Sequence, residues 1–521
     1  MQTTEIDKYK DRTFNIRPLC LWAFLVGVTI VMCLWSLWAV AVWMLFLVIA
    51  FVAIQFLKTR DAVLKFFGTS RLFFIGALVI CLAAILSFGI TTLSYTHQKS
   101  FGGTNILTGT VEKHRFLHVN EGVSYFILSG AKYDDKKISG RVIVFITEFQ
   151  GEGKTPVTGT QVSLETRINR AEANDMNINS RVKYSANISF ENIDITGKNR
   201  GLRHSILRYS KTFFEKYLSP VNGGLMYSML FGDKSELDGE LRDDFAIAGL
   251  AHVLAVSGMH VVIIIGMLIA FLKLCRVRQK YRFPIILVAL FFYCYLCGFV
   301  YPILRASMMF MILMANKIYL RKTDLLSSIC AAAIVTLIIF PYAILSVSFQ
   351  LSYACMLGIA LFMHPTTKLL QKTIHPKTPR LLRAIQNFFI KGTAMYVCVT
   401  LITLPIVIKF FGYIPVYGIV ANLFILPVLV LCFQVVVLSL VTWIAFPLLY
   451  PINYLIDFVR WGTKALAGAP GAVIHATNSG YWFIFFIIGI ILCTRFIFMP
   501  KVYKYSAATF FMVLYCIGFL V

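Results

Sequence analysis

The sequence predicts a polytopic α-helical membrane protein with one small β domain inserted outside the bilayer. Of the 521 residues, 58% are hydrophobic and 14% are charged, whereas soluble proteins carry roughly 25% charged residues. Apolar runs of the roughly 20 residues that a helix needs to cross a bilayer recur along most of the chain. Between residues 98 and 203 these runs give way to short alternating segments. We therefore expect about 11–13 transmembrane helices and one domain that lies outside the membrane.

Residues 1–97 are predicted to form an N-terminal membrane region of three helices. Residues 18–57 stay apolar for about twice the length of one crossing, so we expect a helical hairpin that turns near Ser36. A third helix follows at residues 72–95 and leads outward. No cleavable signal is expected at the start of the chain. Both flanks of the hairpin are rich in lysine and arginine, which places the N-terminus in the cytoplasm by the positive-inside rule.

Residues 98–203 are predicted to form an extracytoplasmic β domain of five or six strands. Turn residues such as Asn120, Asp134 and Gly159 separate the alternating runs, which is typical of a small antiparallel barrel or sandwich. The length suits an OB-like barrel, although spacing alone leaves the sandwich open. The domain contains no cysteine, so its own core must hold it together. The clearest alternating runs are residues 123–128, 141–146 and 181–188.

Residues 204–244 are amphipathic, with an interruption at residues 220–224, and we expect helices that lie on the outer membrane face. Residues 245–521 are predicted to form the transmembrane channel domain. Residues 414–448 could hold one long helix or two short ones. Two short helices broken near Pro427 would bring Lys501 and Lys504 to the cytoplasmic side. The other candidate spans are residues 253–274, 283–299, 303–320, 324–340, 344–363, 389–410, 481–499 and 507–521.

The formal net charge of +25 has two explanations. Basic residues mark cytoplasmic loops and touch anionic lipid, or they form a path for a polyanion. From residue 245 onward the acidic residues are Asp324 and Asp457, a scarcity that topology alone does not explain. Buried cations near predicted spans are functional hypotheses by default. Lys409 can snorkel, Arg460 can pair with Asp457 on a surface helix, and Arg305 is the best candidate to line a pore.

Residues 249–260 form the strongest local constellation. On a continuous helix, His252, Ser257 and His260 would share one broad face. Two histidines without a third ligand make a poor zinc site, and the sequence offers no His-Glu-x-x-His motif. A serine and a histidine three residues apart on one rigid helix rarely reach the geometry of a hydrolase. Helix packing and a polar gate remain the two main interpretations.

The order of motifs resembles the ComEC family of inner-membrane channels for DNA uptake in natural competence. The resemblance rests on residues 230–234, 249–252 and 256–261, on Arg305 to Ser307 after Pro302, on residues 348–352 with Gly358, and on Asn422 with Pro427. The family implies a protein that receives DNA outside and passes one strand inward. Many members add a metallo-β-lactamase-like domain, whose His-x-His-x-Asp-His cluster this sequence lacks. We therefore expect no enzymatic activity, no metal and no cofactor.

Basic residues alternate with aromatic residues in the β domain, as proteins that bind single strands require. Aromatic residues in such strands usually form the core, so DNA contact there is a weaker prediction. The candidate DNA contacts are Lys113, Arg115, Lys136, Lys137, Arg141, Arg181 and Lys183.

The predicted function is an inner-membrane channel that translocates single-stranded DNA into the cytoplasm during natural transformation. His252, Ser257, His260 and Arg305 are the candidate pore residues. The chain has no Gly-x-x-x-x-Gly-Lys-Ser/Thr loop, so energy must come from a partner. The expected partners are single-stranded DNA, membrane lipid, an outer DNA receptor, a nuclease and a cytoplasmic ATP-driven motor. The alternatives are an exporter of small solutes or lipid-linked molecules and, less favoured, an intramembrane serine hydrolase.

Overall fold

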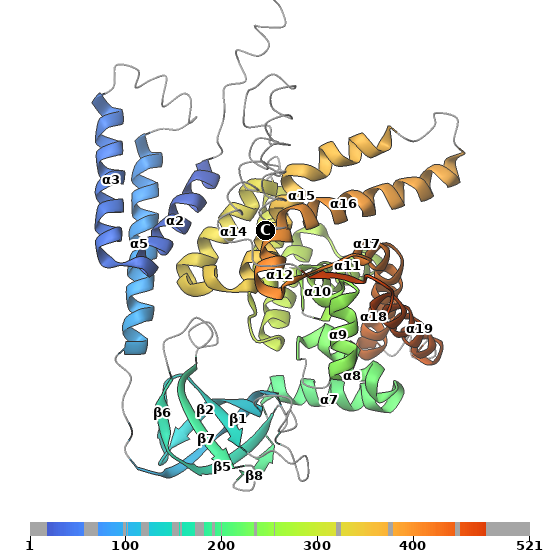
Figure 1. Cartoon of the computed structure of the whole chain (residues 1–521), viewed down its shortest axis with the longest axis horizontal. Coiled ribbons are helices and arrows are strands. Elements are labelled where there is room, and N and C mark those ends of the chain that lie inside the picture. The colour runs from blue at the N-terminus through green and yellow to red at the C-terminus, as the bar shows by residue number, and fades with distance from the viewer. Residues whose placement is uncertain are drawn as a thin grey trace, which may run out of the picture. The chain divides into compact units, whose positions relative to one another are not determined.

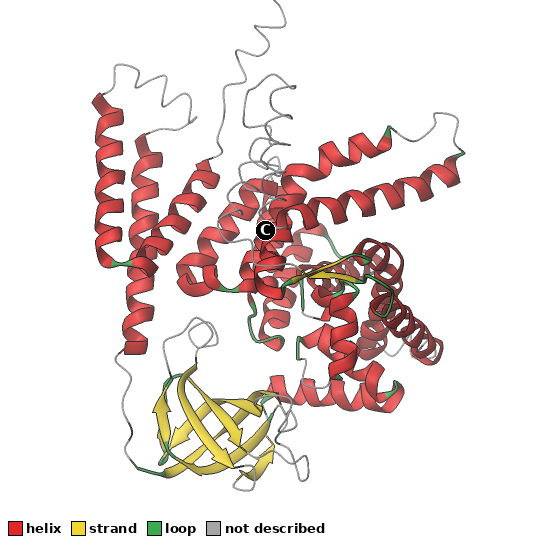
Figure 2. Ribbon diagram, viewed as in Figure 1, coloured by secondary structure: helices red, strands yellow, loops and turns green. Residues whose placement is uncertain are grey.

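The computed structural model describes residues 18–56, 71–96, 101, 103–115, 124–147, 156, 159–171, 182–189, 193–198, 201–233, 237–254, 256–318, 325–372, 379–442 and 449–475. Helices dominate, and an eight-stranded sheet and a two-stranded sheet are set into the described part of the chain (Figure 2). The chain divides into two compact units, which are described separately. The first comprises Met1–Gly89, Met308–Ile419 and Val473–Val521, and the second comprises Ile90–Ser307 and Val420–Ala472. The division into four regions stays a prediction.

The first unit begins with the predicted hairpin, which the structure confirms. Helix α2 (Pro18–Trp35) and helix α3 (Leu37–Phe56) are separated by Ser36, whose Oγ accepts a hydrogen bond from the backbone N–H of Ala39 at 3.1 Å. This is the bond by which a serine caps the start of a helix. Trp43 Nε1 donates to Thr29 Oγ1 at 3.1 Å and joins the two helices. The third predicted helix is also present as α5 (Arg71–Thr96).

The remaining helices of the first unit are α14 (Leu325–Ile339), α15 (Val347–Gln371) and α16 (Arg380–Phe411). Helices α15 and α16 lie side by side as an antiparallel hairpin (Figure 1). They approach closely at Gly358, where an added Cβ would lie 2.5 Å from the carbonyl oxygen of Cys398. Such an approach between backbones requires a residue without a side chain. Strands β9 (Tyr413–Pro415) and β10 (Val473–His475) pair in antiparallel fashion.

The stretch after β9 corrects the sequence prediction. The expected two short helices broken near Pro427 are one continuous helix, Gly418–Thr442. It comprises α17 (Gly418–Val420), a π-helical turn at Ala421–Ile425 and α18 (Leu426–Thr442). Proline lacks the N–H that an α-helix needs four residues after each carbonyl. The wider turn just before Pro427 loosens this pattern locally, so the helix continues through the proline.

Among the described residues, four helices are long and apolar enough to cross a membrane: Gly76–Tyr95, Val347–Gln371, Leu382–Phe411 and Gly418–Thr442. Shorter apolar helices occupy Trp22–Trp35, Trp38–Ile49, Gly258–Leu274, Pro302–Ile312 and Leu325–Ile339. The protein is therefore a helical membrane protein, and the count of 11–13 crossings stays a prediction. The predicted spans at residues 481–499 and 507–521 lie outside the described residues.

The second unit begins with the β domain, which has more strands than the five or six expected. Two short pieces, β3 and β6, account for the difference, because alternation over two or three residues leaves little signal in a sequence. The sheet runs in the order β6-β7-β4-β2-β1-β5-β8, and β3 pairs with β2. The strands are β1 (Asn105–Arg115), β2 (Ser124–Tyr133), β3 (Lys136–Lys137), β4 (Arg141–Thr147), β5 (Thr160–Thr166), β6 (Ile168–Arg170), β7 (Val182–Ser189) and β8 (Ile193–Lys198).

Two clusters of buried apolar residues hold the β domain together, a large one and a small one. Phe126, Leu128 and Val144 are fully buried at alternate positions of β2 and β4, and Tyr184 of β7 joins the same cluster. Ile127 and Ile143 lie on the opposite face of β2 and β4 and belong to the small cluster, so both faces of this part of the sheet are covered. Among the described residues the hydrogen-bonded path ends at β6 and β8. The closed OB-like barrel therefore stays a prediction.

The helices of the second unit are α7 (Leu202–Tyr217), α8 (Pro220–Phe231), α9 (Gly239–Ile247), α10 (Ala251–Leu254), α11 (Gly258–Leu274), α12 (Gln279–Leu296), α18 and α19 (Leu449–Ala467). Helix α13 (Tyr301–Ile318) begins here and continues into the first unit.

Helix α8 differs from its prediction as an amphipathic surface helix. Residues 222–231 are all buried, so α8 is a core element of this unit. Residues 220–224 do not interrupt a helix but begin one. Pro220 takes the first helical position, where a proline costs no hydrogen bond, and Ser219 precedes it as the cap.

Replacing Gly358 by alanine will destabilise the α15–α16 pair. The new methyl group would lie 2.5 Å from the Cys398 carbonyl oxygen, so one helix must shift. We expect a loss of about 1–3 kcal/mol, typical of overpacking, measured by thermal unfolding of the detergent-solubilised protein. The matched control is Gly89→Ala on α5, where an added Cβ meets nothing within 4 Å. Equal stability of the two variants would contradict the packing argument.

Candidate functional site

The predicted pore residues lie around a turn, which corrects the proposed shared helix face. Helix α10 ends at Leu254, Val256 and Ser257 are not helical, and α11 begins at Gly258. Ser257 has the extended backbone of a helix cap, with φ −122° and ψ 172°. Serine favours this position because its side chain can satisfy amide groups of the first turn. As a result, His252 is exposed and His260 is fully buried.

His260 and Ser257 form a capping pair. The backbone N–H of Ser257 donates to His260 Nδ1 at 3.0 Å, and Ser257 Oγ lies 3.2 Å from the same nitrogen. A glutamate or glutamine three residues after a cap usually accepts this bond, and here the imidazole does so. The ring packs edge to face against Phe433 of α18, with centroids 5.0 Å apart.

This geometry bears directly on the hydrolase alternative. The serine and histidine do come within hydrogen-bonding distance, contrary to the expectation for one rigid helix. However, Nδ1 has one lone pair in the ring plane, and it already accepts the amide N–H of Ser257. A general base needs that lone pair for the serine proton. The arrangement therefore favours a structural cap over a nucleophile–base pair.

Arg305 of α13 lies against the start of α11. Its side chain is 6% exposed, and its Nη2 lies 3.2 Å from where a Cβ on Gly258 would be. The exposed amide groups at a helix start carry a partial positive charge. A guanidinium beside this pole creates a cationic point inside the unit, and the absence of a side chain at Gly258 permits the approach. We name Ser257, Gly258 and Arg305 the α11 cationic site.

The end of α8 packs against the same turn. Gly232 follows α8 with a left-handed φ of +78°, and a Cβ there would lie 2.9 Å from Val256 Cγ2. Tyr293 Oη of α12 donates to the carbonyl oxygen of Leu230 at 3.0 Å. The two motifs at residues 230–234 and 256–261, which are separate in sequence, are thus neighbours in space.

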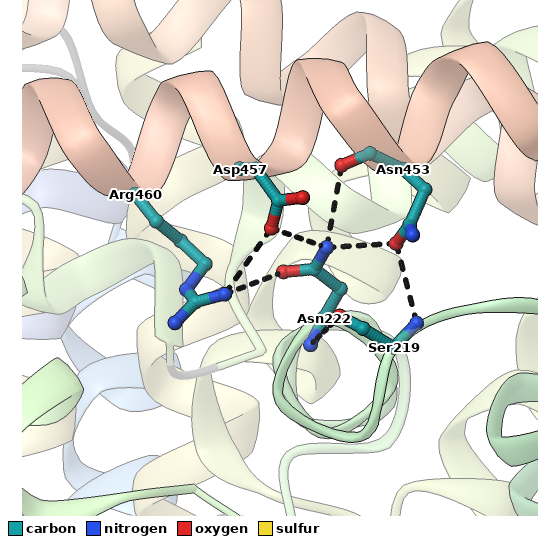
Figure 3. A network of polar contacts seen from close by, with 5 residues as sticks. All are labelled: Ser219, Asn222, Asn453, Asp457 and Arg460. Carbon is teal, nitrogen blue, oxygen red and sulfur yellow. Dashed lines mark hydrogen bonds and ion pairs between the residues drawn. The ribbon is translucent and has the colours of Figure 1, made fainter.

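A buried polar network joins α8 to α19, and sequence reasoning missed it. Asn222 is fully buried (Figure 3). Its Nδ2 donates to Asn453 Oδ1 at 2.7 Å and to Asp457 Oδ1 at 2.8 Å, while its Oδ1 accepts from Arg460 Nη1 at 3.2 Å. Arg460 also pairs with Asp457 at 3.2 Å, which confirms the predicted local pair. An asparagine in an otherwise apolar helix was the signal that could have revealed the network.

The comparisons with known proteins decide the family. Residues 229–501, just over half of the chain, match the sequence model described as "Competence protein". The chain belongs to the competence protein family. It is 27% identical to ComE operon protein 3 of Bacillus subtilis (strain 168) over 196 residues, which make up 36% of this chain and 25% of that protein. The chain thus matches a quarter of the length of this relative. No solved structure matches the chain.

In this competence protein, the family match includes the motifs at residues 230–234 and 256–261, Arg305 and most of the polar network. Asn222 lies just before it, and the β domain lies wholly outside it. All three residues of the α11 cationic site therefore lie in the part of the chain that matches the family.

The candidate DNA contacts of the β domain differ in their surroundings. Lys136 and Lys137 are exposed on β3, whereas Arg141 is paired with Glu112. Lys183 lies 5.6 Å from the ring centroid of Tyr95. Lys113 and Arg115 lie on β1, opposite Ile127 and Tyr125 of β2, and Arg181 lies outside the described residues.

Helix α7 joins the β domain to the membrane helices of the second unit. Arg203 Nε donates to the carbonyl oxygen of Leu296 at the end of α12 at 3.1 Å. The neighbouring His204 packs against Gly159 of the β domain, and its Nε2 is buried without a hydrogen-bond partner among the described residues. Burial is the main reason that the pKa of His204 lies below 6.5, and the charges of Arg203 and Arg208 add to it.

Replacing Asn222 by leucine will destabilise the protein by about 2–4 kcal/mol, because buried partners of a lost hydrogen bond stay unsatisfied. A denaturant titration of the detergent-solubilised protein measures this loss. Asn169→Ala, at an exposed position of β6, is the control and should change little. Equal stability of Asn222→Leu and wild type would show that the network contributes nothing.

We name the contact of α7 with the β domain the α7 joint. This joint will weaken in mild acid. Because the folded pKa of His204 is below its ordinary value of 6.5, the folded state binds the proton less readily than the unfolded chain. Stability is therefore intact above pH 6.5 and falls as the pH drops through the folded pKa. His204→Gln removes this loss, whereas His364→Gln, at an exposed position, keeps it. Protease susceptibility of the joint between pH 7.5 and 5 tests this, and an identical pH profile for His204→Gln and wild type would overturn it.

Proposed function

We propose that this protein is an inner-membrane channel that translocates single-stranded DNA into the cytoplasm during natural transformation. Membership of the competence protein family and the similarity to ComE operon protein 3 support a role in DNA uptake. The observation that carries the proposal is the α11 cationic site. In it, a buried arginine meets the positive end of a membrane helix at a family motif.

The chemistry of the site suits a phosphate backbone. A charged side chain inside a membrane protein is costly and generally faces a cavity or a ligand path. Phosphate oxygens are favourable partners for both a guanidinium and the free amides of a helix start. Because every nucleotide carries the same phosphate, such a site acts on DNA without regard to sequence.

Ser257 and His260 have a positioning role in this proposal. Their mutual hydrogen bond fixes where α11 begins, and Phe433 holds the imidazole in place. The start of the helix and its amide groups are thereby held beside Arg305. His252 is exposed at the end of α10 and provides a polar surface for the strand to pass.

The wider arrangement is part of the same proposal. The N-terminus lies in the cytoplasm, and the β domain lies outside as an OB-like barrel that contacts incoming DNA through Lys136 and Lys137. Helices α7 and α9 lie at the outer membrane face. An outer receptor delivers the DNA, a nuclease removes the other strand, and a cytoplasmic ATP-driven motor supplies the energy.

The decisive experiment follows labelled DNA into a DNase-resistant form inside cells. The deletion strain should take up none. Arg305→Gln should lower uptake by about 10- to 100-fold, because a hydrogen bond to a charged group contributes about 1.5–3 kcal/mol. Arg278→Gln, at an exposed loop position, is the matched control and should leave uptake unchanged.

Different results would contradict the proposed function and the proposed site. Wild-type uptake by the deletion strain would overturn the function and favour the exporter. Normal uptake by Arg305→Gln, with normal amounts of protein in the membrane, would overturn the site and leave the function standing.

A further inference from the structure

The charged residues that the structure describes in the first unit are all basic. None of the residues that the structure describes in this unit is an aspartate or a glutamate. Its described basic residues are Arg71, Lys317, Lys368, Lys372, Arg380, Arg383, Lys391 and Lys409. Five of these lie where α15 ends and α16 begins. We name residues 364–372 and 379–391 the basic tip.

Helix α16 is longer than the hydrocarbon core of a bilayer is thick. Helix α16 has 32 residues, which corresponds to about 48 Å at about 1.5 Å per residue. A bilayer core is about 30 Å thick. Residues 392–411 carry no charge apart from Lys409 near the end, so this apolar stretch fills the core. The preceding residues 380–391 therefore extend about 18 Å beyond it.

The basic tip is an ordered and exposed structure. Gln371 Nε2 donates to Asn387 Oδ1 at 3.3 Å and joins the two helices beyond the apolar stretch. Leu382, Arg383, Ala384 and Ile385 are consecutive and all exposed, so no described element packs around this turn of the helix. The five basic side chains are exposed as well.

We infer that the basic tip is a second contact for the translocated strand, which receives single-stranded DNA on the cytoplasmic side of the membrane. This inference rests on the proposed function. An exposed concentration of lysine and arginine without acidic neighbours attracts a polyanion. The positive-inside rule places it in the cytoplasm, where the strand emerges. Phe388 is 57% exposed on the same helix and offers a ring on which a base can stack.

Anionic lipid is a poorer occupant of this surface. The attraction of a charged lipid surface falls off within about 8–10 Å at physiological salt. The start of α16 lies about 18 Å from the bilayer core along the helix axis. The headgroups take up about 5–7 Å of that length, so Arg380, the outermost basic residue of α16, lies at the outer limit of that field.

Site-specific photocrosslinking tests the inference in cells that are importing DNA. Benzoylphenylalanine replaces Phe388 in the full-length protein, and the matched control carries it at Phe46 of α3. Both phenylalanines are 57% exposed, but Phe46 lies within an apolar helix. We expect a DNA adduct at position 388, none at position 46, and none without added DNA.

A charge variant gives an independent measurement. The variant loses four exposed charges together, through Lys368→Gln, Lys372→Gln, Arg380→Gln and Arg383→Gln. With a labelled oligothymidylate and the detergent-solubilised protein, the slope of log K against log salt should fall by about 3, since each phosphate contact on single strands contributes about 0.7. The control removes Lys273, Arg278 and Lys280, which are exposed elsewhere, and should keep the slope.

The outcomes are distinct. Normal uptake with a lipid or protein adduct at position 388 in place of DNA would overturn the inference while the proposed function stands. An unchanged salt slope in the charge variant would overturn it as well. Absence of DNA uptake by the wild type would instead remove the proposed function.

Discussion

The contact between Arg305 and the start of α11 is the constraint on which the second unit depends. A guanidinium beside a helix start places like charges together, so the surrounding structure must hold both in place. Gly258 provides the space, the Ser257–His260 bond fixes the first turn, and Phe433 holds the imidazole. Ser257, Gly258 and His260 therefore each have a physical task. In the proposed function, this cationic point meets the phosphate groups of the imported strand.

The polar network of α8 and α19 performs a different task. Asn222 satisfies its donors and its acceptor without leaving the core, because Asn453, Asp457 and Arg460 lie on one side of α19. Apolar packing alone would allow the two helices to slide, whereas these directional bonds fix one register. Helix α8 ends at Gly232, which contacts Val256 in the turn before α11. The network thus determines the position of an element on which the cationic site rests.

Much of the fold could be predicted from the sequence, because apolar length and alternation are strong signals. The break at Ser36 and the strands at residues 141–146 and 181–188 follow directly from them. The helix through Pro427 could not be predicted, because a π-helical turn is a local accommodation that leaves no periodic trace. The break before Ser257 was missed for a related reason. Small apolar residues on both sides continue the helical pattern, and only the capping bond to His260 reveals the turn.

The site was predicted less completely than the fold, and the difference follows from what each depends on. Arg305 could be identified alone, because a charge inside an apolar stretch needs an explanation. Its neighbour Gly258 could not, since the need for a small residue arises from a contact between segments that are 47 positions apart. The same holds for Asn222, whose partners are more than 230 residues away. Charge is different, because it can be counted along the chain without knowing any contact. The absence of acidic residues around the basic tip is visible in the sequence, and the structure adds that these cations share one exposed end of a hairpin. A one-signed surface of this kind does not help a protein to fold, because its charges repel each other. Under the proposed function, this basic surface is therefore better explained by what it binds than by what it stabilises.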